Sequence, residues 1–501
     1  MDLQTYLTLD GTAMAQLVRS KEVSPAELLA LSFERLEQVD PELNAFTSLR
    51  KEQAFAALEK SQGGLFGGVP MALKNISQSL AGEPLTAGSK LLKGTAAERD
   101  SHFVARLGEA GLSFIGHTNT PEFGLKNISE PELYGASRNP WNPEYSPGGS
   151  SGGAAAAVAS GIVPMAGASD GGGSIRIPAS FTGLFGLKPT RGRTPVGPGT
   201  GRQWQGASID FALTRTVRDS CTLLDVLQTI QPEAAFQTPL FPGKYRDAIS
   251  QKPEGKLRIA IAADSPVGTE VSQDAKDALQ KTVQWLLQEG HEVEEAANNI
   301  DGVCLMQDYY LMNSGEMALL ARNLGRMLGR PLDAGDMEIE SWLLSEAGKR
   351  VSAADYSASL ASWDVASAHM AALHQRYDFY LTPATAFTAP KIGELTHSAA
   401  SRTDLLERLA RTQTMGAQQE LIYEMFLPSL TYTPYTQLAN LTGQPAMSVP
   451  VHVTDSGLPI GVQFMASKGD ESRLLALAHQ IEQSSLWAGQ HGNPAFASVQ
   501  Q

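Results

Sequence analysis

Gly148-Gly149-Ser150-Ser151-Gly152-Gly153 and Asp170-Gly171-Gly172-Gly173-Ser174-Ile175-Arg176 are the two stretches of this chain that decide its fold and its chemistry. Each places a serine among glycines, so backbone N–H groups can approach a ligand there without obstruction by side chains. Serines in glycine-rich stretches are also typical of plain turns. A third residue, Lys74, bears on the choice between these interpretations, because it ends the apolar run of residues 69–73.

The length and composition indicate a globular protein of enzyme size. The chain has 501 residues, of which 42% are hydrophobic, and this is enough to bury a large core. We predict one domain over residues 1–501, with an N-terminal helical segment at about 1–65 and a second helical section at about 303–427.

The charge and the cysteines exclude several classes of partner. The net charge of −14 and the lack of a basic stripe argue against nucleic acid, whose phosphates require clustered Lys and Arg. The two cysteines, Cys221 and Cys304, are too few and too far apart for a disulfide framework or a zinc site. We therefore predict no nucleic acid and no metal.

Neither the N-terminus nor the uncharged stretches indicate a membrane. Residues 1–4 include no basic segment leading into an apolar one, so we expect a cytoplasmic protein. Two uncharged stretches, 145–169 and 425–454, are long enough to span a bilayer. However, the first is mostly Gly, Ala and Ser, and four prolines break the second, so both are predicted to be buried in the protein.

The N-terminal segment opens with a clear helix signal. Ser24-Pro25-Ala26-Glu27 combines an N-cap serine, a proline at the first helical position and a glutamate three residues after the cap. Leu29, Phe33 and Leu36 follow at helical spacing and mark one buried face. This pattern predicts a helix.

From Gly68 to about Thr216, short apolar runs alternate with glycine, proline and helical stretches. This pattern indicates an α/β fold with a largely internal sheet. The predicted strands are residues 69–73, 112–116, 162–168 and 184–187, with a helix at 102–109. After a long connection at 231–256, the further predictions are strands at 257–262, 379–382, 446–451 and 460–464 and helices at 272–289 and 471–483.

The helical section at 303–427 is rich in Leu, Met and Ala. Its methionines, 306, 312, 317 and 327, would suit an adaptable pocket, because thioether side chains repack easily. Packing of a helical core is the interpretation that we favour for them.

A catalytic serine needs a base, because its hydroxyl is a weak nucleophile near neutral pH. The usual base is histidine, but the nine histidines are scattered and none lies in a catalytic motif. Residues 148–152 also match the G-x-S-x-G pattern of α/β-hydrolases, which has force only between a strand and a helix. Pro143 and Pro147 stand where that strand would be, and this disfavours an α/β-hydrolase.

Taken together, these residues resemble the amidase signature family, and the resemblance is long. It includes Lys74 after Gly68-Val69-Pro70, residues 116–123 (Gly-His-Thr-Asn-Thr-Pro-Glu-Phe), residues 139–142 (Asn-Pro-Trp-Asn), and the two serine stretches from 147–153 and 170–179. It continues through residues 183–190 (Gly-Leu-Phe-Gly-Leu-Lys-Pro-Thr), 441–446 and 458–464.

The resemblance implies an α/β fold of the amidase signature type, a large mixed β-sheet covered by helices on both faces, with residues 303–427 covering the substrate. It also implies amide hydrolysis by a triad. Ser174 is then the nucleophile, Ser150 is the bridging serine after a cis peptide bond, and Lys74 is the base. No cofactor is needed for this chemistry.

The physical chemistry of a buried lysine agrees with this assignment. Burial near few anions lowers the pKa of an ammonium from about 10.4 towards neutrality, so the amine can accept a proton. A lysine at the end of an apolar strand suits such burial. The alternative for an isolated strand-end lysine is a side chain that extends to solvent.

The glycine run at 171–173 is suited to form an oxyanion hole, because successive amides can be aimed at one point. We predict the N–H groups of Gly171, Gly172 and Gly173, together with that of Ser174, as donors. Asp170 and Arg176 are predicted to brace this loop, and Ser151 to support it from the other serine stretch.

Three functions remain open, and a stand-alone amidase is the first. Residues 135–142 and 188–193 look similar to bacterial amidases of linear or cyclic amides, including nylon-oligomer hydrolases (6-aminohexanoate cyclic dimer hydrolases). Under this hypothesis we also expect carbamates and esters as small-molecule substrates, because the same acyl transfer applies, and we expect a monomer or homodimer.

The second is the glutamine-hydrolysing subunit of a tRNA-dependent amidotransferase. Against it, many family members, those subunits included, carry Gly-Pro where this chain has Phe211-Ala212. The third is a non-catalytic scaffold, against which the intact trio of Lys74, Ser150 and Ser174 argues.

Overall fold

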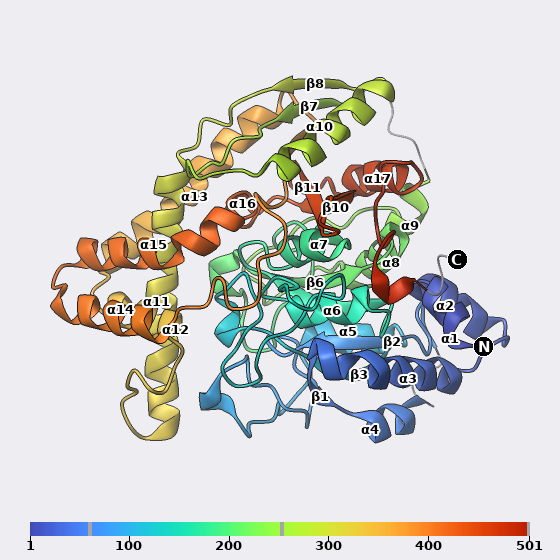
Figure 1. Ribbon diagram of the computed structural model, residues 1–501, viewed down its shortest axis with the longest axis horizontal. Helices are drawn as coiled ribbons and strands as arrows, with labels where there is room; N and C mark the ends of the chain where they lie inside the picture. The colour runs from blue at the N-terminus through green and yellow to red at the C-terminus, as the bar shows by residue number, and fades with distance from the viewer. Residues whose placement is uncertain (59–62, 251–254, 498–501) are drawn as a thin grey trace.

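The computed structural model describes residues 1–58, 63–250 and 255–497 (Figure 1). Within these residues, 11 strands form one sheet in the order β1-β3-β2-β4-β6-β5-β10-β11-β9-β7-β8. The strands are β1 (Phe46–Leu49), β2 (Pro70–Lys74), β3 (Ser113–Thr118), β4 (Met165–Asp170), β5 (Phe185–Lys188), β6 (Ile209–Thr214), β7 (Arg258–Ile261), β8 (Glu292–Glu295), β9 (Phe379–Pro383), β10 (Ala446–Val453) and β11 (Pro459–Ala466).

The sheet mixes parallel and antiparallel pairs and is covered on both faces. β2 is parallel to β3 and β4, and β7 is parallel to β8 and β9, whereas the other pairs are antiparallel. Every residue of β2, β4 and β11 is buried. Since successive side chains of a strand point to opposite faces, burial of all of them requires cover on both sides. The predicted fold class is confirmed.

The helices that cover the sheet come from the whole length of the chain. They are α1 (Leu3–Thr8), α2 (Gly11–Arg19), α3 (Pro25–Leu43), α4 (Lys51–Ala56), α5 (His102–Glu109), α6 (Gly152–Ala159), α7 (Arg176–Thr182), α8 (Val217–Leu227), α9 (Tyr245–Ala248), α10 (Gln273–Gln288), α11 (Gly302–Leu328), α12 (Ile339–Gly348), α13 (Ala353–His374), α14 (Ala399–Arg411), α15 (Met415–Tyr432), α16 (Gln437–Thr442) and α17 (Glu471–Glu482). Among the residues described, no helix is both long and apolar enough to cross a bilayer.

The start of α3 confirms the sequence signal. The Ser24 side chain accepts a hydrogen bond from the Glu27 N–H at 3.2 Å, and the Glu27 carboxylate accepts one from the Ser24 N–H at 2.9 Å. Leu29, Phe33 and Leu36 are buried. A reciprocal capping box of this kind satisfies two backbone donors that a helix leaves unpaired at its start.

Two sequence predictions are wrong at element boundaries. The N-terminal segment predicted to be helical over 1–65 also contains β1, a four-residue strand paired antiparallel with β3. A strand this short shows no period in the sequence, and its pairing with β3 decides its conformation. The strand predicted at 162–168 begins later, at Met165, after Pro164, which has no N–H to donate to a neighbouring strand.

The connection predicted at 231–256 contains the short helix α9, and residues 251–254 of it lie outside the described part of the chain.

The long helices α11 to α15 form a group of their own on one side of the molecule, away from both termini (Figure 1). They enclose a separate apolar core that includes Met312, Met317, Leu343 and Phe426. In sequence, β9 interrupts this helical group between α13 and α14 and joins the sheet between β11 and β7.

Two adjacent parallel strands bring two residues of the predicted site, Lys74 and Asp170, to one edge of the sheet. Lys74 is the last residue of β2 and Asp170 is the last residue of β4, and these strands are neighbours in the sheet. Because carboxyl ends of parallel strands meet at the same edge, Lys74 lies beside the loop that carries Ser174.

Candidate active site

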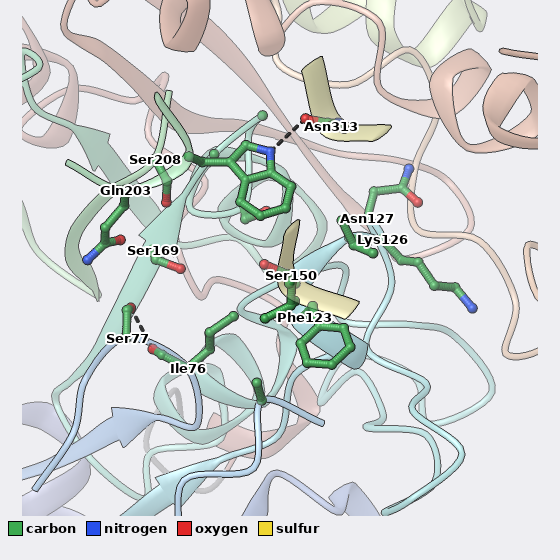
Figure 2. A pocket seen from close by; sticks show the side chains of 18 of the residues that line it. Ile76, Ser77, Phe123, Lys126, Asn127, Ser150, Ser169, Gln203, Ser208 and Asn313 are labelled. Carbon is green, nitrogen blue, oxygen red and sulfur yellow. Dashed lines mark hydrogen bonds between the residues drawn. The ribbon is translucent and has the colours of Figure 1, made fainter. Parts of the chain in front are cut away.

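A cavity of about 530 Å³ lies between this edge of the sheet and the helices α11 and α15. Ser150, Ser169 and Ser174 all line it. Figure 2 shows Ser150 and Ser169 beside the apolar side chains of Ile76 and Phe123. The two glycine-rich stretches that are separate in sequence therefore meet in one pocket.

Lys74 is completely buried beneath the cavity, at the end of β2. Its Nζ donates to the Ser150 Oγ at 2.7 Å and to the Ser169 Oγ at 2.9 Å. Burial lowers the pKa of Lys74 to about 7, although the charges of Asp210 and Asp170 act in the opposite direction. Near neutral pH, a large fraction of this lysine is therefore a neutral amine that can accept a proton.

Ser150 follows a cis peptide bond, as predicted, between Gly149 and Ser150. Gly149 packs so closely against Ile128 that a Cβ at this position would lie 2.6 Å from the Ile128 backbone nitrogen. Ser151 links this loop to the end of β4: its Oγ donates to the Ser169 carbonyl at 3.2 Å and accepts from the Ser169 N–H at 3.3 Å. Backbone packing thus fixes the position of Ser150.

Ser174 stands at the cavity wall, on the loop between β4 and α7, and its side chain is mostly buried. Its hydroxyl makes no hydrogen bond with another described residue, so the Lys74–Ser150 contact is not extended to Ser174 in this structure. A substrate in the cavity would meet the Ser174 hydroxyl directly.

The glycine run beside Ser174 presents fewer donors than predicted. The Gly173 N–H donates to the Asp170 Oδ1 at 2.7 Å, because the Asp170 carboxylate folds back over its own loop. This corrects the prediction of Gly173 as an oxyanion donor. By contrast, the N–H groups of Gly171, Gly172 and Ser174 have no acceptor among the described residues, and all three residues line the cavity.

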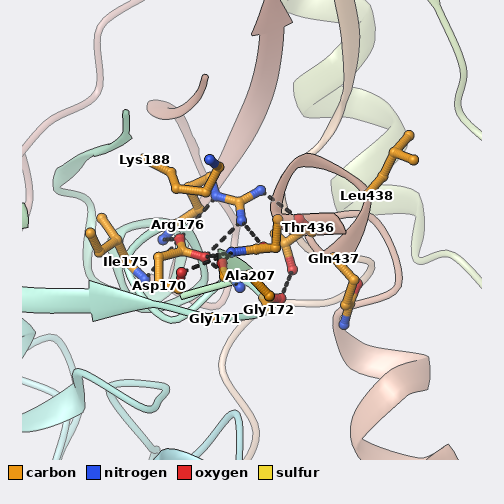
Figure 3. Close-up of polar contacts among 12 residues, drawn as sticks. Asp170, Gly171, Gly172, Ile175, Arg176, Lys188, Ala207, Thr436, Gln437 and Leu438 are labelled. Atoms are coloured by element: carbon orange, nitrogen blue, oxygen red, sulfur yellow. Dashed lines mark hydrogen bonds and ion pairs between the residues drawn. The ribbon is translucent and has the colours of Figure 1, made fainter. Parts of the chain in front are cut away.

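The Asp170 and Arg176 side chains form a buried ion pair behind this loop, with 2.8 Å between Arg176 and the Asp170 Oδ1 (Figure 3). Burial alone would raise the pKa of Asp170, but the Arg176 guanidinium holds it at about 2. Arg176 also donates to the Thr436 carbonyl and to the side chains of Gln463 and Asn440. The loop that carries Ser174 is therefore tied to α16 and β11.

Asp210 is a buried carboxylate on β6 and was not predicted from the sequence as a site residue. It accepts hydrogen bonds from Ser77 at 2.6 Å and from Gln203 at 2.7 Å, and burial raises its pKa. Ser77 and Gln203 line the cavity. The signal for Asp210 was present in the sequence, since a charged residue stands inside the otherwise apolar strand of residues 209–213.

Most of the remaining cavity wall is apolar or aromatic, and much of it comes from the predicted helical section. These residues are Ile76, Ala87, Leu92, Phe123, Leu125, Ile177, Trp204, Met306, Tyr309, Tyr310, Leu320, Phe426 and Leu430. Lys126 also lines the wall, but it extends away from Ser150 (Figure 2), and its ammonium pairs with Glu340 at 3.0 Å.

The four methionines have different environments. Met312 and Met317 are fully buried core residues, as favoured from the sequence, whereas Met306 lines the cavity and Met327 is 57% exposed. The nine histidines, all within the described residues, contribute nothing to the cavity wall. In the part of the chain that is described, no group of three His, Cys, Asp or Glu side chains could hold a metal ion.

Comparison with known proteins identifies the family. The family model described as Amidase matches residues 27–475. A lipoamidase of Enterococcus faecalis is 39% identical over 481 residues, which are 95% of this chain but only 63% of that longer protein. A 6-aminohexanoate-cyclic-dimer hydrolase of Paenarthrobacter ureafaciens is 35% identical over 95% of both chains.

A solved structure of a 6-aminohexanoate cyclic dimer hydrolase matches with a TM-score of 0.88 and 34% identity, over 99% of both chains. The family match, the near full-length relatives and the superposed fold agree with the serine and lysine residues gathered at one sheet edge. The chain belongs to the amidase signature family of hydrolases.

Proposed function

We propose that this protein hydrolyses carbon–nitrogen amide bonds through an acyl-enzyme on Ser174, with Ser150 and Lys74 as the proton relay. One observation carries the proposal: the buried Lys74 amine, whose pKa is about 7, lies 2.7 Å from the Ser150 hydroxyl. A base with a pKa near the working pH and within hydrogen-bond distance is what general base catalysis requires.

In the first half of the reaction, the Ser174 oxygen forms a bond to the amide carbonyl carbon. The Ser174 proton passes to Ser150 as the Ser150 proton passes to the Lys74 amine. The resulting tetrahedral intermediate collapses when the carbon–nitrogen bond breaks, and the proton held by Lys74 returns through Ser150 to the leaving amine.

In the second half, water attacks the ester carbonyl of the acyl-enzyme and loses its proton through the same relay. The bond to Ser174 then breaks, and the proton held by Lys74 returns through Ser150 to the Ser174 oxygen, which releases the carboxylic acid and restores the hydroxyl. We assign stabilisation of the negative oxygen in both halves to the N–H groups of Gly171, Gly172 and Ser174, since none of them is engaged elsewhere among the described residues.

The cavity favours small amides with hydrocarbon segments, linear or cyclic. Its volume of about 530 Å³ lies within the usual range for small-molecule sites, and its wall is mainly apolar and aromatic. The names of two relatives, lipoamidase and 6-aminohexanoate-cyclic-dimer hydrolase, indicate substrates of this kind. Carbamates and esters follow the same acyl transfer and belong to the same proposal.

A glutamine-hydrolysing amidotransferase subunit is not favoured by these similarities or by Phe211-Ala212. The single domain, the monomeric or dimeric state and the cytoplasmic location stay predictions from the sequence.

The proposal is tested by mass spectrometry of the intact protein after exposure to a panel of anilides, peptide amides, lactams, carbamates and glutamine. We expect an added acyl mass on Ser174 with at least one amide, and no added mass in Ser174→Ala. Acylation at another residue would refute the role of Ser174. Turnover of glutamine alone would support the amidotransferase subunit, and inertness to the whole panel and to serine-directed inhibitors would support a non-catalytic scaffold.

A further inference from the structure

Two hydroxyl groups from outside the catalytic loop hold its glycine carbonyls. The Tyr309 hydroxyl, on α11, donates to the Gly171 carbonyl at 2.8 Å. The Thr436 hydroxyl donates to the Gly172 carbonyl at 2.7 Å, and Figure 3 shows these two residues side by side. Each hydrogen bond fixes the plane of one peptide unit in the glycine run.

Fixing a carbonyl also fixes an N–H. A trans peptide unit is planar, with the carbonyl of one residue and the N–H of the next pointing in opposite directions. The bond from Tyr309 to the Gly171 carbonyl therefore sets the direction of the Gly172 N–H. This N–H has no acceptor among the described residues, and Gly172 lines the cavity.

The two neighbouring peptide units differ in how firmly they are held. The unit between Gly172 and Gly173 is held on both sides, because Thr436 binds its carbonyl and Asp170 accepts from its N–H. The unit between Gly171 and Gly172 is held at its carbonyl alone, by Tyr309. Glycines flank this unit, so no Cβ opposes its rotation.

Tyr309 is well suited to hold a peptide unit in place. The residue is 9% exposed, and its ring packs near Tyr310 and Trp363, with ring centroids 6.0 Å and 6.5 Å away. Burial raises the pKa of its hydroxyl, which therefore stays protonated and able to donate at neutral pH.

We propose that Tyr309 is a positioning residue of the oxyanion hole, which keeps the Gly171–Gly172 peptide unit turned so that the Gly172 N–H can donate to the substrate oxygen when it becomes negative. This inference rests on the proposed amide hydrolysis by Ser174. Under this proposal α11 has two roles: it lines the substrate cavity, and through Tyr309 it orients an N–H donor of the oxyanion hole.

Tyr309→Phe removes the hydroxyl and keeps the ring. With the 4-nitroanilide of hexanoic acid as the probe, we expect kcat to fall about 10-fold to 100-fold. Loss of a whole donor costs about 10²–10³, and here the donor is misoriented rather than deleted. KM should change less than about 3-fold, because the Tyr309 ring that lines the cavity is retained.

A second readout separates positioning from packing. A trifluoromethyl ketone with the same acyl chain places a negative oxygen in the oxyanion hole when Ser174 adds to it, so its affinity should fall by the same factor as kcat. The midpoint of the pH profile should not move, because Lys74 donates to Ser150 and Ser169 and makes no hydrogen bond with Tyr309. The matched control is Tyr356→Phe, which removes a tyrosine hydroxyl bound to Glu316 of α11, outside the catalytic cavity.

Parallel losses of kcat and ketone affinity in Tyr309→Phe, absent in Tyr356→Phe, would support the proposal. A kcat within twofold of wild type would overturn it. So would a loss confined to KM with unchanged ketone affinity, or an equal loss in the control. If the wild-type protein forms no acyl-enzyme and binds no ketone, the proposed function itself has failed, and with it the inference.

Discussion

Replacing Lys74 by methionine should abolish catalysis and, at neutral pH, make the protein more stable. Methionine has a similar length but no charge, so it removes the catalytic base without leaving a large hole. Lys74 is fully buried, and its burial lowers its pKa from 10.5 to about 7. A lysine in this position destabilises the fold whenever it must be protonated there.

The size and the sign of the effect follow from these two pKa values. Lowering the pKa of Lys74 from 10.5 to about 7 corresponds to a destabilisation of the folded state by roughly 5 kcal/mol. This destabilisation is fully present below about pH 7, where Lys74 is charged in both the folded and the unfolded protein. It vanishes above about pH 10.5, where Lys74 is neutral in both. At pH 7 roughly 4 kcal/mol of it remains.

The substitution also removes the hydrogen bonds of Lys74 to Ser150 and Ser169, worth about 1 kcal/mol each. Lys74→Met should therefore be more stable than wild type by roughly 2 kcal/mol at pH 7. The advantage should shrink as the pH rises, and the two stability curves should cross at about pH 9.

Urea denaturation of both proteins between pH 6 and pH 9.5 measures this difference directly, because the other titrating groups are shared. Lys51→Met, at an exposed site, controls for loss of a lysine in general and should leave stability nearly unchanged. A constant difference between Lys74→Met and wild type over this pH range would refute the reasoning, since it would mean that the pKa of Lys74 is not displaced. The same pKa should appear as the midpoint of the acidic limb of the wild-type kcat/KM profile, near pH 7.

Three further predictions concern neighbouring residues. Ser150→Ala should lower kcat by about 10²–10⁴ in a steady-state amidase assay, the usual share of general acid–base catalysis, and a wild-type rate would remove Ser150 from the relay. Arg176→Met should lower the free energy of unfolding by about 3–5 kcal/mol in urea denaturation, because Asp170 is left as an unpaired buried charge; a loss under about 1 kcal/mol would contradict the role of this ion pair. Asp210→Asn removes a negative charge that raises the pKa of Lys74, so the acidic limb of kcat/KM should move to lower pH, whereas an unchanged or upward-shifted limb would show that the two groups are not coupled.

The sequence could predict what depends on local spacing. The capping box of Ser24 and Glu27, the helix at 102–109 and the strand that ends at Lys74 are all set by residues close together in the chain. The cis bond before Ser150 could be predicted only because the glycine-rich stretch resembles a known family.

What could not be predicted depends on contacts between distant segments. Nothing in the sequence around Ser169 or Tyr309 indicates a role in the site. Their roles depend on hydrogen bonds between distant segments, from Lys74 to Ser169 and from Tyr309 to the Gly171 carbonyl. The direction of the Gly173 N–H could not be predicted either, because the sequence of a glycine run does not indicate which of its N–H groups will donate to the nearby Asp170 carboxylate.

Strand β9 has a mechanical consequence for the helices that cover the cavity. It lies between α13 and α14 in sequence, yet it is hydrogen-bonded inside the sheet, between β11 and β7. The helices α11 to α15 are connected through β9 to the sheet. They therefore cannot move away from the cavity as one rigid body unless the pairings of β9 with β11 and with β7 break. We therefore expect substrates to reach Ser174 through small movements of loops and side chains, while the helices that cover the cavity and the sheet beneath it move as one body.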